Sequence, residues 1–222
     1  MQLCQLDLNK MSFHAFSGDG ALKLLAIVGS QRKDGNSYLL AREVLDSLGV
    51  DYEIVQLAGK DLQFCTICEE CVSKDCVLDD DFNEVFGKMK EADGFVFSVP
   101  KYLFAASKFL CFLERLCTVR HMRKHGGYSV NPQSLEFKLF SGEKPFCMFV
   151  VSGTGEVDDQ MLKVVADYIE APGLKLVHHD KAPFVAVNVK AGDDRGEVLK
   201  NKEATEECKH LARKIVDSIY GP

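Results

Sequence analysis

Short apolar runs alternate with longer segments of helical periodicity along most of this 222-residue chain, and this alternation restricts the fold more than any other feature. The apolar runs predict strands, because they are too short for helices and rich in branched or aromatic side chains. Strands are predicted at 22–28, 51–57, 94–99 and 145–151, with a fifth within 174–189. Helices are predicted at 36–48, 79–89, 107–116, 157–169 and 199–219, where apolar residues recur on one face.

Strands separated by helices form right-handed βαβ units, which build a parallel sheet with helices on both faces. We therefore expect one α/β domain over residues 21–222, preceded by an N-terminal extension at 1–20. Residues 118–143 break the alternation, since they are basic at first and then contain Gly126-Gly127 and Asn131-Pro132. A segment of this length without a strand or helix pattern is predicted to be an insertion into the domain.

The composition limits the classes of partner. The formal net charge is -6, so no basic surface is predicted for nucleic acid. No apolar run reaches the roughly 18 residues that span a bilayer, and residues 1–20 lack the pattern of a secretory signal, so we expect a cytoplasmic protein. Nine cysteines are many for a cytosolic chain, where disulfides are rare, and clustered cysteines there indicate metal or redox chemistry.

The carboxyl ends of the predicted strands are where a ligand is expected, because open parallel sheets bind ligands beyond that edge. Four loops follow these ends, at 29–37, 58–78, 100–106 and 152–156. The functional residues are therefore sought in these four loops.

The loop after the first strand reads Gly-Ser-Gln-Arg-Lys-Asp-Gly-Asn-Ser from 29 to 37. It leads into a helix, whose free N–H groups and dipole favour an anion, typically a phosphate. Ser30, Asn36 and Ser37 can add hydrogen bonds, and Arg32 can add charge. The loop is neither a Walker A loop nor a Gly-x-Gly-x-x-Gly dinucleotide motif. An ordinary turn capped by Asn36 or Ser37 is the alternative.

Four cysteines lie within twelve residues of the second loop, at Cys65, Cys68, Cys71 and Cys76. Their spacing, C-x2-C-x2-C-x4-C, is close to the C-x2-C-x2-C-x3-C-P run that binds iron–sulfur clusters in bacterial ferredoxins. The chain has a single set, so Cys76 would have to ligate the same cluster as the other three. The motif favours a [4Fe–4S] cluster, while structural zinc and unligated or redox-active thiols remain open. The other cysteines are predicted to be ordinary, mostly core residues: Cys4, Cys111, Cys117, Cys147 and Cys208.

Two further loops have the features expected of a binding site for a flat ligand. After the third strand, Pro100 stiffens the turn, and Tyr102 and Phe104 could lie against an apolar ring. After the fourth strand, Ser152-Gly153-Thr154-Gly155 would let the backbone approach a planar ligand closely. Packed or ordinary turns are the alternatives in both places.

Together, three segments resemble the NADPH-dependent FMN reductase group of flavodoxin-like proteins, and more closely the iron–sulfur flavoproteins of anaerobic archaea and bacteria. They are Gly-Ser-x-Arg-x-x-Gly-Asn-Ser at 29–37, the cysteine motif at 65–76, and Pro-x-Tyr-x-x-x-x-Ser at 100–107. The resemblance covers 22–116 well and the rest by architecture only. It implies a flavodoxin-like, doubly wound sheet of five parallel strands in the order 2-1-3-4-5.

The resemblance also implies roles for the loops. The first would hold the FMN phosphate, the third would border the isoalloxazine ring, and the fourth would line the other side of that ring. The four cysteines would bind a [4Fe–4S] cluster near the flavin. The implied flavin contacts are Ser30, Arg32, Gly35, Asn36, Ser37, Pro100, Lys101, Tyr102, Leu103, Phe104, Ser152, Gly153, Thr154 and Gly155.

The implied activity is electron transfer centred on the flavin, with no side chain assigned as acid, base or nucleophile. FMN accepts electrons in pairs or singly and a cluster takes one at a time, so the pair suits a relay between a ferredoxin-like carrier and a two-electron acceptor. A cluster-free NAD(P)H-dependent FMN or quinone reductase is the main alternative, and a zinc-stabilised binding module is another. Related proteins are homodimers or homotetramers, and the same is expected here.

Overall fold

The computed structural model describes residues 22–127, 139–181 and 184–221. The predicted N-terminal extension lies outside these ranges, and so do residues 128–138 of the predicted insertion. The domain boundaries drawn from the sequence therefore stay predictions.

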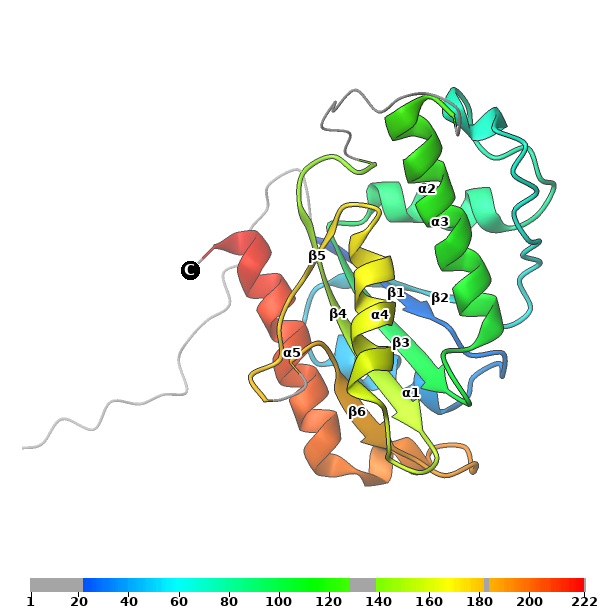
Figure 1. Ribbon diagram of the computed structural model, residues 1–222. Helices are drawn as coiled ribbons and strands as arrows, with labels where there is room; N and C mark the ends of the chain where they lie inside the picture. The colour runs from blue at the N-terminus through cyan, green and yellow to red at the C-terminus, as the bar shows by residue number, and fades with distance from the viewer. Residues whose placement is uncertain (1–21, 128–138, 182–183, 222) are drawn as a thin grey trace, which may run out of the picture.

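Six parallel strands form one sheet (Figure 1). Five of them follow the path β2-β1-β3-β4-β5, which confirms the predicted flavodoxin-like order 2-1-3-4-5. The strands are β1 (Lys23–Val28), β2 (Asp51–Gln56), β3 (Gly94–Lys101), β4 (Lys144–Ser152), β5 (Leu174–Leu176) and β6 (Val187–Lys190).

The fifth position of the sheet is shared by two short strands. β5 pairs with the start of β4, from Lys144 to Phe146, and β6 pairs with its end, from Phe149 to Ser152. The intervening residues 177–186 leave the sheet and return to it. The predicted fifth strand at 174–189 is thus in the right place, but the chain divides it and carries it one residue further.

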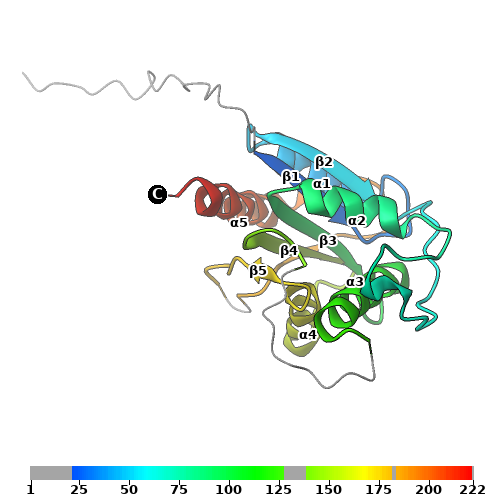
Figure 2. The same ribbon diagram turned by 90° about the horizontal axis from the view of Figure 1, so that it is seen from above.

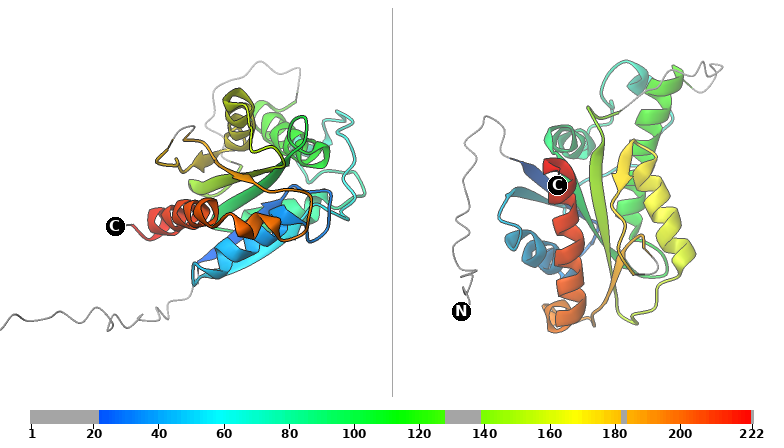
Figure 3. Two further views of the ribbon diagram at one scale, coloured as in Figure 1. Left: turned by 90° about the horizontal axis from the view of Figure 1, so that it is seen from below. Right: turned by 90° about the vertical axis from the view of Figure 1, so that its left-hand side faces the viewer.

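Five α-helices cover the sheet: α1 (Asn36–Asp46), α2 (Phe82–Glu91), α3 (Ser107–His125), α4 (Asp159–Glu170) and α5 (Lys202–Tyr220). Two single-turn 3₁₀ helices, η1 (Glu70–Val72) and η2 (Glu197–Lys200), lie in the connections. Helices α1 and α5 pack on one face of the sheet, and α2, α3 and α4 pack on the other (Figures 2 and 3). The expected helices on both faces are confirmed.

Each face of the sheet has its own hydrophobic core, because successive side chains of a strand point to opposite faces. In β3, Phe95 and Phe97 face α2, α3 and α4, whereas Val96 faces α1 and α5. The Phe97 ring lies 6.0 Å from Phe109 and 5.6 Å from Phe146, centroid to centroid. All of these side chains are fully buried, so β3 is the centre of both cores.

Helix α3 is longer than its sequence pattern predicts. It was expected to end at Leu116, with an insertion from 118, but it continues through His125. Val119 and Met122 are buried and extend the apolar face by two turns. The charged residues around Val119 and Met122 obscure this periodicity in the sequence. Arg123 and the other basic side chains of the last turn also interact favourably with the negative end of the helix dipole.

The first loop is held close to α3 by a glycine. A Cβ on Gly29 would lie 2.9 Å from the Cβ of Phe109, which is closer than two carbon atoms approach without a shift. A glycine at this position therefore lets the carboxyl end of β1 pack directly on α3.

Candidate functional site

A cleft of about 390 Å³ lies beyond the carboxyl ends of β1, β3, β4 and β6. It lies at the edge of the sheet that the parallel topology predicts for a ligand. The loop after each of these strands contributes a wall. The lining residues are Ser30, Arg32, Lys33, Asp34, Gly35, Asn36, Ser37, Pro100, Lys101, Tyr102, Val151, Ser152, Gly153, Thr154, Ala191, Gly192, Asp193 and Arg195.

The N-terminus of α1 opens into this cleft. Its N-cap residue is Gly35, and within the described part of the chain no side chain caps the first turn and no acidic residue lies in it. The expected alternative, a turn capped by Asn36 or Ser37, is therefore not what the structure shows. Ser30 shapes the loop instead, since its Oγ accepts a hydrogen bond from the Arg32 N–H at 3.0 Å. The helix start thus keeps free N–H donors for an anion.

A fourth loop, residues 191–196, completes the cleft and was not predicted from the sequence. The Asn36 side chain fastens it: Nδ2 donates to the carbonyls of Gly192 and Asp194, both at 3.0 Å, and Oδ1 accepts from the Gly196 N–H at 2.8 Å. Arg32 adds an exposed ion pair with Asp193 at 3.2 Å. The Asn36 side chain therefore holds the backbone of this loop in place.

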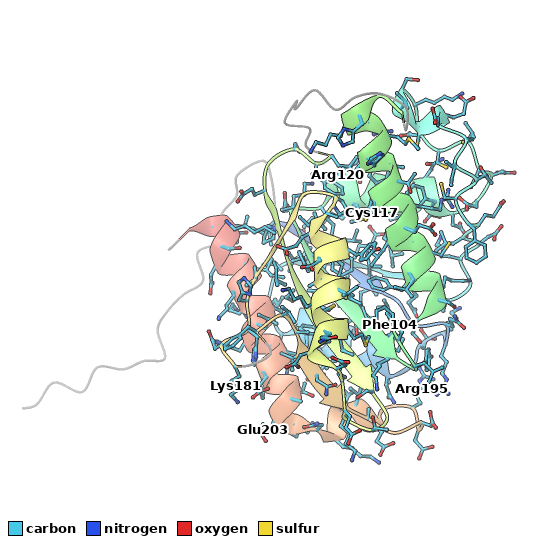
Figure 4. The ribbon with its side chains drawn as sticks, in the orientation of Figure 1. Phe104, Cys117, Arg120, Lys181, Arg195 and Glu203 are labelled. Atoms are coloured by element: carbon cyan, nitrogen blue, oxygen red, sulfur yellow. The ribbon has the colours of Figure 1, made fainter. Side chains whose placement is uncertain are left out.

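Four cationic side chains line the cleft: Arg32, Lys33, Lys101 and Arg195. The two acidic residues that line it, Asp34 and Asp193, both have partners. Asp34 accepts a hydrogen bond from Gln56 Nε2 at 3.0 Å, and Asp193 pairs with Arg32. Arg195 lies at the carboxyl edge of the sheet (Figure 4). The excess of positive charge suits an anionic ligand.

The loop after β3 divides its side chains between two surfaces. Tyr102 lines the cleft and is half exposed, but Leu103 and Phe104 do not line it. The Tyr102 N–H donates to the Phe104 carbonyl at 2.9 Å, and this tight turn directs Phe104 into a groove with Tyr168 of α4. Of the residues after β4, Ser152, Gly153 and Thr154 line the cleft and Gly155 does not.

All four predicted metal ligands line a second, small cavity of about 20 Å³. Cys71 is buried, Cys65 and Cys76 are partly buried, and Cys68 is exposed. The cavity is closed on its inner side by α3, through Arg115, Thr118, Val119 and Met122. The four cysteines of the motif therefore lie around one cavity.

Side chains from the neighbouring helices hold the cysteine loop. Asn83 of α2 clips the Cys76 backbone, since its Oδ1 accepts from the Cys76 N–H at 3.2 Å and its Nδ2 donates to the Cys76 carbonyl at 2.6 Å. Arg123 of α3 donates to the Cys71 and Lys74 carbonyls at 3.2 and 3.0 Å. In the loop itself, Ile67 and Glu69 have positive φ angles of 55° and 59°, which non-glycine residues seldom adopt.

The cysteine cavity fits a group of soft, positively charged character. Burial raises the pKa of the Cys71 thiol, and the neighbouring Cys76 and Cys65 raise it further. A bound metal removes this cost, because thiolates are its ligands. In the described residues, however, no three Cys, His, Asp or Glu side chains stand ready as a metal-ligand set. The donors are of the right type and line one cavity.

The two cavities are separate. They share no lining residue. Figure 1 shows the segment between β2 and α2 running beside α3. Gln31 Nε2 donates to Ser107 Oγ at 2.6 Å, so α3 begins beside the first loop. Arg115 to Met122 lie about 12 to 22 Å further along the axis, at a rise of about 1.5 Å per residue. The resemblance implies a cluster near the flavin, which stays a prediction; within one chain the structure separates the two cavities.

In the described ranges, no helix is long and apolar enough to cross a membrane.

Comparison with known families identifies one match. The family described as NADPH-dependent FMN reductase matches residues 22–175, which is more than half of the chain. The match includes the cleft loops after β1, β3 and β4 and the whole cysteine motif. The loop at 191–196 lies beyond it.

Several curated proteins are similar over a shorter stretch. An iron–sulfur flavoprotein of Methanocaldococcus jannaschii is 38% identical over 96 residues, covering 41% of this chain and 50% of that protein. Iron–sulfur flavoproteins of Archaeoglobus fulgidus and Methanosarcina thermophila are 39% and 34% identical over 83 and 86 residues, covering 36% and 37% of this chain and 41% and 45% of theirs. The chain thus spans about half the length of the curated relatives it matches.

Solved structures share the fold. A flavone reductase superposes with a TM-score of 0.57 at 18% identity, covering 90% of this chain and 63% of that chain. An NAD(P)H:quinone oxidoreductase from Methanothermobacter marburgensis gives 0.51 at 13% identity, covering 88% and 97%. At these identities the likeness shows the flavodoxin-like architecture alone.

Proposed function

This chain belongs to the NADPH-dependent FMN reductase family, and from that premise we propose that it is a redox protein that binds FMN in the cleft and a [4Fe–4S] cluster at its four clustered cysteines. The similarity to iron–sulfur flavoproteins supports this reading of the two sites. The function would be to relay electrons between a one-electron carrier of the ferredoxin type and a two-electron acceptor.

The observation that carries the FMN site is the start of α1. Its first turn lacks a side-chain cap and acidic residues in the described structure, and it opens into a cleft with four cationic side chains. These groups would bind the phosphate, with Ser30 and Ser37 beside it. Tyr102 and the 152–154 segment would border the flavin ring. When bound, FMN supplies the capacity to take electrons in pairs or singly.

The observation that carries the cluster site is the common cavity of Cys65, Cys68, Cys71 and Cys76. When bound, the cluster supplies a one-electron store. A homodimer or homotetramer is part of this proposal, as is a ferredoxin-like protein or NAD(P)H as the electron donor. Because the two cavities lie at different positions along α3, electrons relayed within one chain would have to cover the distance between them.

A second candidate function is a cluster-free NAD(P)H-dependent FMN or quinone reductase. One observation favours it: the cysteine cavity shares no lining residue with the cleft in the described structure. Under this function the cleft keeps the same role and the cysteines only shape the loop.

Metal and flavin content tests the two functions. We would purify the protein without oxygen and measure iron, acid-labile sulfide, zinc and FMN per chain. About four iron, four sulfide and one FMN per chain supports the relay. One FMN without iron or sulfide supports the reductase, and zinc in place of iron supports the zinc-stabilised module. A chain that binds no flavin contradicts both redox functions.

Cys68→Ala separates the cluster from the flavin. We expect loss of iron and sulfide with FMN retained, because Cys68 lines only the cysteine cavity. Cys117→Ala is the matched control: its thiol donates to the Tyr168 carbonyl at 3.3 Å and lies outside that cavity. Loss of FMN in Cys68→Ala would instead make the cysteine loop a support for the flavin site.

A further inference from the structure

Arg115 is the one residue with a formal charge among those that close the cysteine cavity from α3. Its side chain is 2% exposed, which is unusual for arginine. A buried guanidinium needs hydrogen-bond partners and a counter-charge, so its surroundings indicate what it is there to do.

The partners of Arg115 hold it rigidly in one position. Nη1 donates to the fully buried Asp80 carboxylate and to the Gln63 carbonyl, the latter at 3.3 Å. The guanidinium lies over the Phe82 ring, with Cζ 4.2 Å from the ring centroid. These contacts come from the cysteine loop and from α2, so the cation is fixed relative to the loop.

Two remaining features of Arg115 concern the sulfur site. Nη2 donates to Cys76 Sγ at 3.1 Å. Nε is buried and has no hydrogen-bond partner among the described residues. An unpaired buried N–H costs stability unless it has an acceptor, so the second feature indicates an acceptor in the same cavity.

We propose that Arg115 sets the reduction potential of the group bound by the four cysteines, through its N–H contact with Cys76 Sγ and its buried charge. This inference rests on the proposed iron–sulfur cluster. A cluster with four thiolate ligands is anionic and gains a further negative charge on one-electron reduction. A fixed cation stabilises the reduced form more, and so it raises the potential.

Arg123 is the matched control, because it carries the same charge on the same helix and also holds the same loop. It donates to the Cys71 and Lys74 carbonyls and pairs with Asp75 at 3.1 Å. It does not contact a sulfur in the described structure, and it does not line the cavity. A general effect of charge or of loop anchoring would therefore be the same in Arg115→Met and Arg123→Met.

The test is a dithionite titration of the cluster in the FMN-loaded protein, followed by electron paramagnetic resonance, together with iron and sulfide content. Arg115→Met is expected to shift the reduction equilibrium at least tenfold toward the oxidised form, which is about 59 mV more negative for one electron. Arg115→Lys is expected to restore most of this shift, and Arg123→Met to shift it less than threefold. An unchanged potential in Arg115→Met, or equal shifts in both arginine variants, overturns the proposal.

Arg115→Met leaves the buried Asp80 carboxylate unpaired, so the double variant Asp80→Asn/Arg115→Met, which removes both charges of the buried pair, protects the test against unfolding. The double variant is compared with wild type, and a shift toward the oxidised form is still expected, because Arg115 contacts Cys76 Sγ and Asp80 does not in the described structure. If the folded double variant loses iron and sulfide, Arg115 holds the site together and the tuning role is wrong. If the wild-type protein contains no iron and sulfide, both the proposed cluster and this inference are wrong. If the wild type contains the cluster but the Arg115 variants leave its potential unchanged, only this inference is wrong.

Discussion

At the scale of single residues, Asp80 shows how the structure uses charge inside the fold. Burial alone would raise the pKa of its carboxyl, but hydrogen bonds from Arg115 and from the Gln63 and Phe82 N–H groups lower that pKa below its usual range. The carboxylate is therefore stabilised in the folded state. Asp80 supports the cysteine loop and the start of α2 together.

Asp80→Asn is expected to lower the free energy of unfolding by about 3–5 kcal/mol at pH 7, because it leaves Arg115 without its counter-ion. A group with a depressed folded-state pKa contributes stability above its unfolded pKa, about 3.9, and loses it as the pH falls toward the folded value. Urea unfolding at pH 7, 5 and 4 should show the difference from wild type shrinking below about pH 5. The exposed Asp79→Asn is the control; a difference that is constant with pH would contradict the account.

Arg195→Ala tests whether this side chain binds the phosphate of FMN in the proposed cleft. We expect FMN to bind about five- to tenfold more weakly, since an exposed charge-assisted contact contributes about 1–1.4 kcal/mol. Riboflavin, which lacks the phosphate, should bind within about twofold of wild type. Flavin fluorescence titration of both ligands gives the comparison, with Lys202→Ala as a control that removes a charge outside the cleft. Equal losses for FMN and riboflavin would place Arg195 at the ring instead.

At the scale of elements, the connection between β6 and α5 becomes part of the site only through α1. The three hydrogen bonds of Asn36 join the first turn of α1 to the 192–196 backbone. Two connections more than 150 residues apart in sequence therefore form one wall.

Asn36→Ala is expected to release this wall. Hydrogen exchange of the 193–196 amides should become at least tenfold faster, because opening the loop no longer breaks three hydrogen bonds. Asn83→Ala is the matched control, since Asn83 clips the Cys76 backbone in the same manner on the other loop. It should speed exchange near Cys76 and leave 193–196 unchanged. Unchanged exchange at 193–196 in Asn36→Ala would mean that the loop is held by other contacts.

At the scale of the whole molecule, α3 connects two sites that share no residues. Its first turn contacts the loop after β1 through Ser107, and its later turns close the cysteine cavity. Packing of α3 on the sheet is continuous through Phe109, Phe112, Leu116 and Val119. A rigid helix of this kind fixes the sites in place without making one depend on the other.

We therefore expect the two sites to bind independently. Removal of iron with a chelator under anaerobic conditions should change the FMN dissociation constant less than about threefold, a coupling free energy below about 0.7 kcal/mol. Fluorescence titration before and after iron removal measures it. A change above tenfold would show that the cysteine loop and the cleft are coupled through α3.

The sequence by itself determined the alternation of strands and helices, the edge of the sheet where the cleft lies, and three of the four loops that line the cleft. Those conclusions follow from local periodicity and from the rule that parallel strands end at one edge, so neighbouring residues suffice. The strand order was implied only by the resemblance to a known family. The motif from Gly29 to Ser37 and the cysteine spacing could also be recognised from the sequence, because each consists of residues close together in the chain. The end of α3 was missed because charged residues interrupt its apolar period.

Only the tertiary structure decided which side chains reach the sites. The turn after β3 sends Tyr102 into the cleft and Phe104 into the groove by α4, although only one residue separates them. The division of the fifth strand brings the 191–196 loop to the cleft, and burial places Arg115 against Cys76, 39 residues away in sequence. Periodicity specifies which face of an element is apolar, but contacts between distant residues depend on how the elements pack, and that is a property of the folded chain.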